Sequence, residues 1–437
     1  MKPAQLLQIS TPTSSAYKDA YNRHRRRPQR PNYIGDFDDL VDFSNPSSDS
    51  RIVPLHLLCP NDNHFQSNDD NDTAGAGSHD TTNYNHSHNN DDKNQQARYK
   101  GPTFGITTHP GFVYIPHALS KRIQMDLAHE SLTQFCNDPH GTNIDLVPMK
   151  QNEIVNGPNE SMWNLWKQDH CYAVNDHVNA SNLNVSINAT NNGIASDSID
   201  SLETKQEYPL KRNTYKSFEK LSWATTGYHY DWTKRSYKED RKSPMPPSMT
   251  ALGSLFAECD SSQSKSQLQL QPFTTAASIV NYYSKKSSMG GHRDDLELDF
   301  TKPVVSISLG LPAVFVLGGK TKEEEPVIGI LVRPGDVMLL AGDSRLCYHG
   351  MARVIPKYVA LPEVDVALEK HASMFQIDSW GDDCFSGDDN YVKKCTLVKR
   401  DLTTPESDVD AVCDFLSEHR ININLRQVLP HGMDRIP

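Results

Sequence analysis

The chain is poor in cysteine, and its few cysteines are not arranged in pairs. Eight cysteines are spread over 437 residues, and no two of them form a C-x-x-C pair. Structural zinc modules and secreted disulfide scaffolds both depend on closely spaced cysteines. The spacing therefore argues against both classes and favours a reducing, intracellular compartment.

Long hydrophobic runs are also absent. No segment reaches the about 18 consecutive apolar residues of a membrane-spanning helix, so we expect no membrane partner. The first 20 residues lack the apolar core of a secretory signal peptide and contain a single acidic residue, Asp19. Four arginines follow, at positions 23, 25, 26 and 27. Such a segment suits a mitochondrial presequence or a nuclear signal equally well, so nucleus, cytoplasm and mitochondrion all stay open.

Most of the chain has no surplus of acidic over basic residues, although the formal net charge of the whole chain is −11. Between Tyr33 and Gln95 there are twelve Asp and no Glu, against only Arg51 and Lys93, which makes a local net charge of −10. The remainder is close to neutral. The total charge therefore does not exclude a nucleic-acid partner.

Composition divides the chain into three parts. Residues 1–32 form a basic N-terminal arm, for which a solvated tail is the alternative interpretation. Residues 33–100 form an acidic Asn/Asp-rich segment with too few apolar side chains to offset the entropy of ordering, so we predict that it is largely disordered. Residues 101–437 form one folded domain, with a disordered Asn/Ser-rich insert at 175–206.

Short strand-like segments dominate the second half of this domain. From Thr274 onward they are rich in β-branched or aromatic residues and are separated by Gly, Pro or charge: ASIVNYY, PVVSISL, AVFVLGG, VIGILV and DVMLLA. Many short strands with such punctuation indicate a sandwich or barrel, of which the jelly roll is one form. We place its core at residues 274–430. Flanking helices are expected through Ile123 and Leu132, at residues 250–259 and after Thr404.

Two histidines and one aspartate form a candidate metal site. His292 and Asp294 are two residues apart, so on an extended chain their side chains point to the same face. His349 lies 57 residues later, after several predicted strands that can return it to the pair. Two imidazoles and one carboxylate on one face of a metal, with other positions open, suit non-haem Fe(II) and oxygen chemistry.

A second H-x-D pair, His229 and Asp231, competes for this assignment. Its context differs, because a basic run and the proline-rich turn 244–247 follow it. His292 is instead followed by strands that end in another histidine. We therefore assign the metal to the His292 pair.

The segment from Tyr208 to Ser243 combines positive charge with aromatic rings. It contains nine basic and four acidic residues, together with Trp223, Tyr228, Tyr230 and Trp232. Such a segment can hold phosphates and stack on a base. A solvated loop over a core aromatic cluster is an equally good interpretation.

The segment RININLR near the C-terminus alternates strictly between aliphatic and polar side chains. The two predicted faces are Ile421, Ile423 and Leu425 against Arg420, Asn422, Asn424 and Arg426. Taken alone, this alternation favours an exposed edge strand. Beside an iron site, however, an inward-facing arginine suits a dicarboxylate, because its guanidinium fork binds carboxylates and stays charged when buried.

These motifs together resemble the AlkB family of Fe(II)/2-oxoglutarate dioxygenases, in particular its eukaryotic homologue-one branch. The segments that resemble the family are LSWATTGYHYDW, NYY, HRDDLELDFTKPVVSISLG, FVLGG, PGDVM, SRLCYHGMARVIP and RININLRQVL. They cover roughly residues 100–170 and 208–430, and their order and spacing agree with the family as well as their identity.

The resemblance implies an α+β fold with a double-stranded β-helix (jelly-roll) core, flanking helices and disordered insertions. It implies that Fe(II), 2-oxoglutarate and O2 are the cofactors, with His292, Asp294 and His349 on the iron. The residues implied for the cosubstrate are Asn281, Tyr282, Tyr283, Arg420, Asn422 and Arg426. Those implied for the substrate are Trp166, Tyr228, His229 and Tyr230. No catalytic residue beyond the iron ligands is implied.

Two positions depart from the family pattern. Asn424 stands where many members have Thr, which is a tolerable polar exchange. The position two residues after the iron aspartate, often Asp in DNA-repair members, is Leu296, and Glu297 follows it. The base preference of the repair enzymes is therefore not transferred to this chain.

The functional hypothesis is oxidative demethylation of methylated bases in nucleic acid, with release of succinate, CO2 and formaldehyde. Loop RNA offers unstacked bases at low cost, which favours tRNA over DNA. The alternatives are a 2-oxoglutarate-dependent protein hydroxylase or demethylase and a non-catalytic jelly-roll protein that binds nucleic acid. We expect the protein to act as a monomer.

Overall fold

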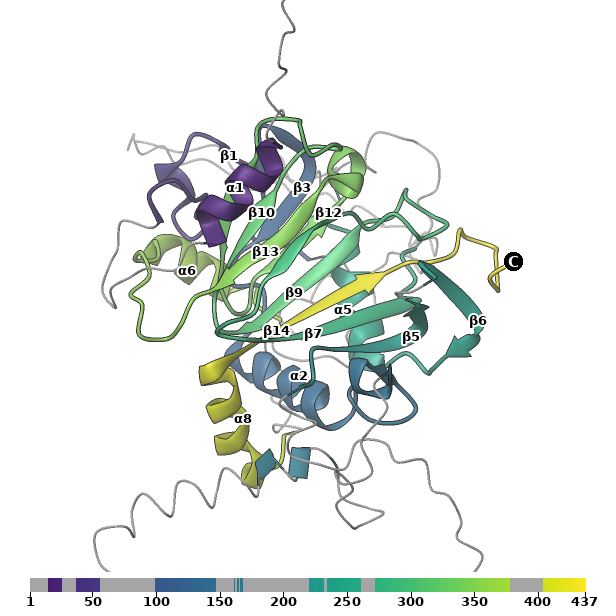
Figure 1. Ribbon diagram of the computed structural model, residues 1–437. Helices are drawn as coiled ribbons and strands as arrows, with labels where there is room; N and C mark the ends of the chain where they lie inside the picture. Colours follow the sequence, from purple (N-terminus) through teal and green to yellow (C-terminus); the bar gives the residue numbers. More distant parts are fainter. Residues whose placement is uncertain are drawn as a thin grey trace, which may run out of the picture.

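Two antiparallel sheets form the centre of the molecule (Figure 1). The computed structural model describes residues 15–25, 37–55, 99–146, 161, 163–164, 166–167, 220–231, 234–260, 272–377 and 404–437. The larger sheet contains, in spatial order, β1 (Ile52–Pro54), β2 (Phe104–Ile106), β3 (His109–Ile115), β12 (Val337–Leu340), β9 (Val304–Gly310), β14 (His419–Arg426), β7 (Ala277–Ser284), β5 (Trp223–Asp231) and β4 (Gly141–Thr142), with β6 (Ser236–Lys242) paired to β5. The smaller sheet contains β11 (Ile328–Val332), β10 (Ala313–Leu317), β13 (His349–Val354) and β8 (Met289–His292).

Three helices cover the outer face of the larger sheet. They are α2 (Lys121–Thr133), α5 (Pro247–Ala257) and α8 (Glu406–Glu418), and in Figure 1 α2 and α8 lie below the strands. Their apolar side chains and those of the outer strand face form one buried cluster. Shorter elements complete the described part: η2 (Pro46–Ser48), η3 (Asn143–Leu146), η6 (Gly342–Leu346) and α6 (Val366–Ser373). None of these helices has the length and hydrophobicity that crossing a membrane requires.

The five strands predicted after Thr274 lie in the two sheets, and β14 occupies an informative position. It pairs with β7 on one side and β9 on the other, so it is a central strand rather than an exposed edge. Its aliphatic side chains Ile421, Ile423 and Leu425 are fully buried against the helices. Because side chains alternate between faces, its polar side chains point into the space between the two sheets.

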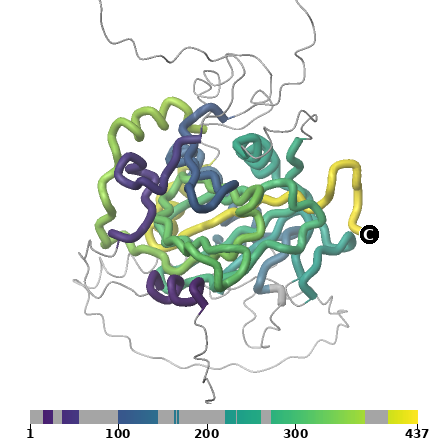
Figure 2. Tube along the Cα trace, turned by 90° about the horizontal axis from the view of Figure 1, so that it is seen from above, coloured from purple at the N-terminus to yellow at the C-terminus, as the bar shows by residue number. Residues whose placement is uncertain are grey.

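The N-terminal arm predicted from composition contains a packed helix. Helix α1 (Ala16–Arg25) lies against the outer face of the smaller sheet (Figure 2). Its Tyr17 and Tyr21 are buried beside Val316 and Ala352. For residues 15–25 the interpretation as a solvated tail is therefore wrong. The Tyr17 ring occupies the space beside three glycines of the sheet and its loops, which have no room for a Cβ: Gly291, Gly318 and Gly350. Two of them adjoin the candidate metal histidines in sequence.

Replacing Tyr17 by alanine should lower the free energy of unfolding by about 3 kcal/mol, because the substitution leaves an aromatic-sized cavity beside the sheet. Chemical denaturation followed by circular dichroism measures this change. The matched control is Tyr358→Ala, since Tyr358 is 62% exposed and its truncation should cost less than about 0.5 kcal/mol. Equal stability of the two variants would contradict the packed position of α1.

Part of the segment predicted to be disordered also belongs to the fold. Val41 forms a parallel bridge with Ile330 of β11, and Phe43 stacks on Tyr114 at a centroid distance of 4.1 Å. Asp42 accepts hydrogen bonds from the buried guanidinium of Arg333. Residues 37–55 therefore extend the folded domain beyond the start predicted near residue 101. Residues 56–98 and the predicted insert 175–206 lie outside the described residues.

Candidate metal centre and adjoining cavities

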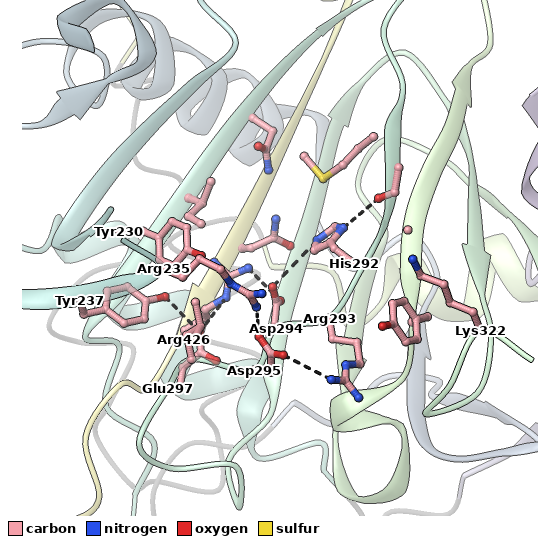
Figure 3. Close-up of a pocket in the computed structure, with 18 residues that line it drawn as sticks. Tyr230, Arg235, Tyr237, His292, Arg293, Asp294, Asp295, Glu297, Lys322 and Arg426 are labelled. Carbon is pink, nitrogen blue, oxygen red and sulfur yellow. Dashed lines mark hydrogen bonds and ion pairs between the residues drawn. The ribbon is translucent and has the colours of Figure 1, made fainter. Parts of the chain in front are cut away.

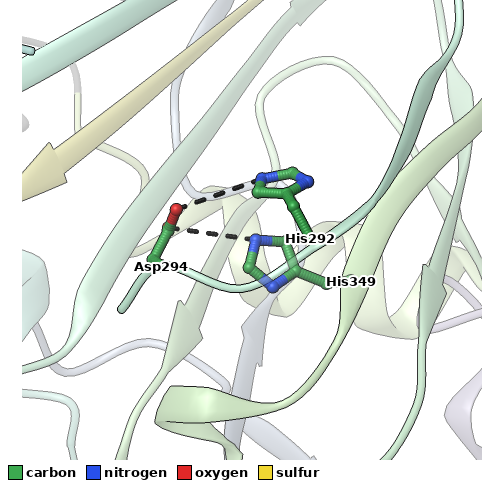
Figure 4. Close-up of side chains that lie close together, drawn as sticks. All are labelled: His292, Asp294 and His349. Carbon is green, nitrogen blue, oxygen red and sulfur yellow. Dashed lines mark ion pairs between the residues drawn. The ribbon is translucent and has the colours of Figure 1, made fainter. Parts of the chain in front are cut away.

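Three side chains converge between the two sheets. His292 ends β8, Asp294 follows it in a loop, and His349 begins β13. Their ligand-type atoms all lie within 4.8 Å of one another, and the side chains point toward a common centre (Figure 4). Carboxylate oxygens of Asp294 lie 4.0 Å from Nε2 of His292 and 3.8 Å from Nε2 of His349. The convergence predicted from the sequence is therefore confirmed.

Backbone carbonyls orient both imidazoles. The Nδ1–H of His292 donates to the carbonyl of Gly290 at 3.0 Å, and the Nδ1–H of His349 donates to the carbonyl of Cys347, also at 3.0 Å. β8 and β13 are paired so that the two histidines lie directly opposite each other. A donor bond at Nδ1 fixes the tautomer and leaves the lone pair on Nε2. Both Nε2 atoms are thus presented to the same point.

Charge and burial bring these groups into metal-binding protonation states. Burial alone would raise the pKa of Asp294, but the charges of Arg426 and of the two histidines outweigh it and hold that pKa well below its usual range. Burial, assisted by His292, lowers the pKa of His349 to about 4. At neutral pH the carboxylate is therefore charged and the imidazole of His349 neutral, as metal binding requires.

The competing H-x-D pair lies elsewhere. His229 is hydrogen-bonded to Ser243, with 3.0 Å between Nε2 and Oγ. Asp231 accepts a hydrogen bond from the backbone N–H of Lys234 within the turn between β5 and β6. Within the part of the chain that the structure describes, the cluster of His292, Asp294 and His349 is the one group of this kind. The structure therefore places a third ligand-type side chain beside the His292 pair.

Two cavities meet at the metal cluster. The outer cavity has a volume of about 550 Å³ and is lined by Tyr230, Arg235, Tyr237, Ile279, Asn281, Met289, Gly290, Gly291, His292, Arg293, Asp294, Asp295, Leu296, Glu297, Lys322, Tyr348, Asn424 and Arg426 (Figure 3). The inner cavity is smaller and is lined by Tyr283, Met289, His292, Asp294, Ser306, Ala313, Phe315, Met338, His349, Gly350, Met351, Arg420, Asn422, Asn424 and Arg426. His292 and Asp294 belong to both linings. The cluster therefore stands at the junction of the two spaces.

Arg420 gives the inner cavity a buried positive charge. The residue is 3% exposed, and its guanidinium donates to the carbonyl of Leu311 at 3.2 Å and to the hydroxyl of Ser308 at 2.8 Å. Its Nε–H has no hydrogen-bond partner, and no carboxylate of the described residues forms an ion pair with it. Burial lowers the pKa of Arg420 only to about 10, so it stays charged at neutral pH. A buried, unneutralised guanidinium is costly unless an anion joins it.

The other residues predicted to hold the cosubstrate divide into two groups. Tyr283, Asn422 and Arg426 line the inner cavity, and Asn281 lines the outer cavity while facing Asn422 in the register of β7 and β14. Tyr282, in contrast, points to the opposite face of β7, where its hydroxyl donates to the carbonyl of Ser131 in α2. The prediction that Tyr282 contacts the cosubstrate is therefore wrong.

Of the four residues predicted to contact the substrate, only Tyr230 lines the outer cavity. Tyr228 lies on the same strand but is 1% exposed, and its hydroxyl donates to Glu239 at 2.7 Å. His229 points to the opposite face of β5 toward Ser243. Trp166 is packed on Trp163 and Phe415 in the core beside α8. The predictions for these three residues are wrong.

Three polar residues next to the metal cluster were missed. Arg345 and Glu297 form a buried ion pair, and Tyr237 donates a hydrogen bond to Glu297. Arg345 lies four positions before His349 in the segment SRLCYHGMARVIP. Glu297 was noted only beside a departure from the family pattern. Nothing in their spacing distinguishes buried residues from exposed ones.

The donor set and the cavities fit Fe(II) and an organic diacid. Two imidazole Nε2 atoms with free lone pairs and one carboxylate suit a non-haem iron that keeps other coordination positions open. The unpartnered Nε–H of Arg420 and the unpartnered Nη1–H of Arg426 are both buried in the inner cavity wall. Two guanidinium donors in one small space, beside a metal cluster, match two carboxylates of one ligand.

Comparison with known proteins gives the same picture. Residues 184–426 match the family model of the 2OG-Fe(II) oxygenase superfamily. The chain is 28% identical over 335 residues to the DNA N(6)-methyladenine demethylase ALKBH1A of Arabidopsis thaliana, which covers 75% of this chain and 78% of that protein. It is 28% identical over 337 residues to the nucleic acid dioxygenase ALKBH1 of Mus musculus, covering 77% of this chain and 68% of that protein. It is also 28% identical over 257 residues to the tRNA demethylase abh1 of Schizosaccharomyces pombe, covering 59% and 72% respectively.

Proposed function

Because the chain belongs to the 2OG-Fe(II) oxygenase superfamily, we propose that it demethylates methylated bases in nucleic acid, with tRNA as the favoured substrate and DNA as the second. Membership makes the protein an iron-dependent and 2-oxoglutarate-dependent enzyme with a jelly-roll core, as predicted from its sequence words. The observation that carries the proposal is the outer cavity, which places basic and tyrosine side chains beside the metal cluster. Relatives named as acting on tRNA and DNA support the same substrate class.

His292, Asp294 and His349 are the proposed iron ligands. The two histidines would bind through Nε2, because their Nδ1–H groups are engaged with backbone carbonyls. When bound, iron, 2-oxoglutarate and O2 supply the oxidation of a methyl group, and succinate, CO2 and formaldehyde leave as products. The protein contributes binding, orientation and exclusion of water.

The inner cavity is the proposed site of 2-oxoglutarate. Arg420 would bind the carboxylate far from the metal through its unpartnered Nε–H, while Tyr283 and Asn422 line the space between. Arg426 and Asn281 lie nearer to the metal cluster and would hold the other end of the molecule. Binding of a carboxylate to Arg420 would break no ion pair of the described residues, because none of their carboxylates is paired with this guanidinium.

The outer cavity is the proposed site of the target base. Tyr230, Tyr237 and Tyr348 offer aromatic surfaces, and the Arg293 guanidinium lies 5.2 Å from the centre of the Tyr348 ring. Arg235, Arg293 and Lys322 are basic residues of the lining that can contact phosphates, and Asp295 lies 2.9 Å from Arg235 and 3.5 Å from Arg293. A base must leave its stack to reach the metal, which costs a few kcal/mol. This cost is smallest for a base in a single-stranded loop. This cost is the reason for favouring tRNA.

The positive charge and tyrosines of the outer cavity also bear on the two alternatives. A protein hydroxylase would share the metal cluster and the inner cavity, but it has no need of phosphate-binding charge around the substrate. A non-catalytic nucleic-acid-binding protein would have no use for an unneutralised buried arginine in the inner cavity.

Quantifying modified nucleosides in tRNA and DNA by mass spectrometry, before and after incubation with the enzyme, tests the proposal. If no methylated nucleoside decreases, and succinate is still formed when a peptide substrate is supplied, the protein hydroxylase is favoured.

Neutralising Arg293 and Lys322 by substitution with glutamine should weaken RNA binding and reduce its dependence on salt. Each lost phosphate contact lowers the slope of log affinity against log salt by about 0.7–1. Fluorescence anisotropy with a tRNA stem-loop at several salt concentrations measures both quantities. The control Lys357→Gln/Lys370→Gln removes two exposed lysines that do not line the outer cavity, so its slope should match the wild type. Identical slopes for both variants would reject this cavity as the nucleic-acid site.

A further inference from the structure

Glu297 is a buried carboxylate beside the metal cluster that is not needed to complete the ligand set. Its side chain is 2% exposed. One carboxylate oxygen lies 3.1 Å from a terminal nitrogen of Arg345, and the other lies 3.3 Å from Nε of Arg426. The hydroxyl of Tyr237 donates to the second oxygen at 3.0 Å. Glu297 therefore joins two arginines and a tyrosine. Figure 3 shows Glu297, Tyr237 and Arg426 in the lining of the outer cavity.

Both arginines also hold Asp294. Arg426 donates to a carboxylate oxygen of Asp294 at 2.8 Å, and Arg345 donates to its backbone carbonyl at 2.7 Å. The side chain and the backbone of Asp294 are thus each fixed by a guanidinium whose other nitrogen faces Glu297. A planar guanidinium held at two points has little freedom to rotate. Glu297 is the common anchor of this frame.

Charge balance explains why the anchor must be an acid. The frame contains the positive charges of Arg345 and Arg426, both buried, and the negative charges of Asp294 and Glu297. Without Glu297 one carboxylate would face two buried guanidinium groups. Burying an unbalanced charge is costly, so the arginines would rearrange around Asp294. Asp294 would then be drawn toward them and away from the two histidines.

We propose that Glu297 is a positioning residue, which acts through Arg345 and Arg426 to hold Asp294 in place for the metal. This inference rests on the proposed function, because it takes Asp294 as a metal ligand. It predicts that Glu297 contributes to metal affinity although it touches no metal. Partners of metal ligands typically contribute roughly 10–100-fold to affinity.

The test is a titration of the full-length protein with Co²⁺ alone, without 2-oxoglutarate or nucleic acid, followed by visible absorption. Glu297→Gln should weaken Co²⁺ binding about 10-fold or more, and Glu297→Asp, which keeps the charge on a shorter side chain, should fall between this variant and the wild type. The control Asp299→Asn changes a nearby buried carboxylate bound by Thr301 and Gln427 rather than by the two arginines. Its Co²⁺ affinity should equal that of the wild type.

Two further measurements make the result decisive. Asp294→Asn is titrated in parallel. If it binds Co²⁺ as tightly as the wild type, the metal assignment itself fails. If it binds weakly while Glu297→Gln and Glu297→Asp both bind normally, only the positioning role of Glu297 is overturned. Should Glu297→Gln unfold, Glu297→Asp carries the test, and unchanged affinity in that variant overturns the proposal.

Discussion

Replacing His292 by alanine should abolish 2-oxoglutarate turnover. The expected loss is at least about 100-fold, since removal of a mere partner of a metal ligand already costs roughly 10–100-fold. The substitution leaves Asp294 and His349 as the only members of the cluster, and two ligands do not hold a metal in an enclosed site. Succinate release in the presence of added Fe(II), without nucleic acid, measures the change directly.

The chain supplies a matched control in its second H-x-D pair. His229→Ala removes a histidine from the same sequence pattern, but that imidazole faces Ser243 on the far side of β5 and lines neither cavity. Turnover of 2-oxoglutarate should stay close to the wild-type value. Because the two variants lose the same side chain, any shared effect of histidine removal cancels. Retained turnover in His292→Ala, or loss of turnover in His229→Ala, would assign the metal to the wrong pair.

Replacing Arg420 by methionine should weaken 2-oxoglutarate binding by about 100-fold, which corresponds to about 3 kcal/mol. The guanidinium is buried, still charged at neutral pH and not paired with any carboxylate of the described residues. Its charge is thus available to the ligand, because no carboxylate of the described residues forms an ion pair with it. Calorimetric titration of 2-oxoglutarate into the metal-loaded protein measures the affinity.

The same substitution should leave the apoprotein as stable as the wild type or make it more stable. An unneutralised buried charge costs stability, and replacing it by an apolar side chain of similar volume removes that cost. Thermal unfolding should therefore show no loss for Arg420→Met without ligand. At one fixed concentration of 2-oxoglutarate, the transition temperature of the wild type should rise more than that of the variant.

Arg333 offers the opposite case in the same fold. It is also buried, at 6% exposure, but its guanidinium is paired with Asp42. Arg333→Met leaves a buried carboxylate unpaired, so it should lower the free energy of unfolding by about 3 kcal/mol without changing 2-oxoglutarate affinity. A destabilised Arg420→Met with normal affinity would mean that Arg420 has a structural role, and the proposed cosubstrate site would be wrong.

Alternation along strands is a local property, and it made the central features of the site predictable. The spacing of His292 and Asp294 placed both side chains on one side of the chain. The alternation of β14 placed Arg420 and Arg426 on one face together. Both predictions depend only on the two-residue period of an extended chain, which needs no knowledge of distant contacts.

Alternation alone does not say which face of a strand lines a cavity. Seven of the eight residues of β7 are buried, so both of its faces are covered, one by helices and one by the other sheet. Alternation places Tyr282 on the face opposite Asn281 and Tyr283, but because both faces are buried it does not say which face meets the cavity. In the structure Tyr282 points to α2. The same ambiguity applies to His229, which points to the face of β5 opposite Tyr230. Tyr228 shares the face of Tyr230, but it is buried and its hydroxyl donates to Glu239.

Composition was a weaker guide than periodicity. Helix α1 has few apolar residues and many basic ones, so its sequence resembles a solvated arm. Its two tyrosines nevertheless bury their rings on the smaller sheet, in space left open by glycines more than 270 residues away. Docking of this kind depends on the shape of a distant surface, which a local window does not contain.

The sequence by itself predicted the cluster of His292, Asp294 and His349, the arginine-bearing strand and the family, because each rests on residue types in a periodic pattern or on ordered motifs along the chain. Only the tertiary structure decided which side chains enter the two cavities, that Glu297 and Arg345 join the metal carboxylate in one charge network, and that α1 supports the smaller sheet. Those features arise from tertiary contacts between segments that are far apart in the chain. Which side chains become buried or paired there depends on the surfaces of both segments.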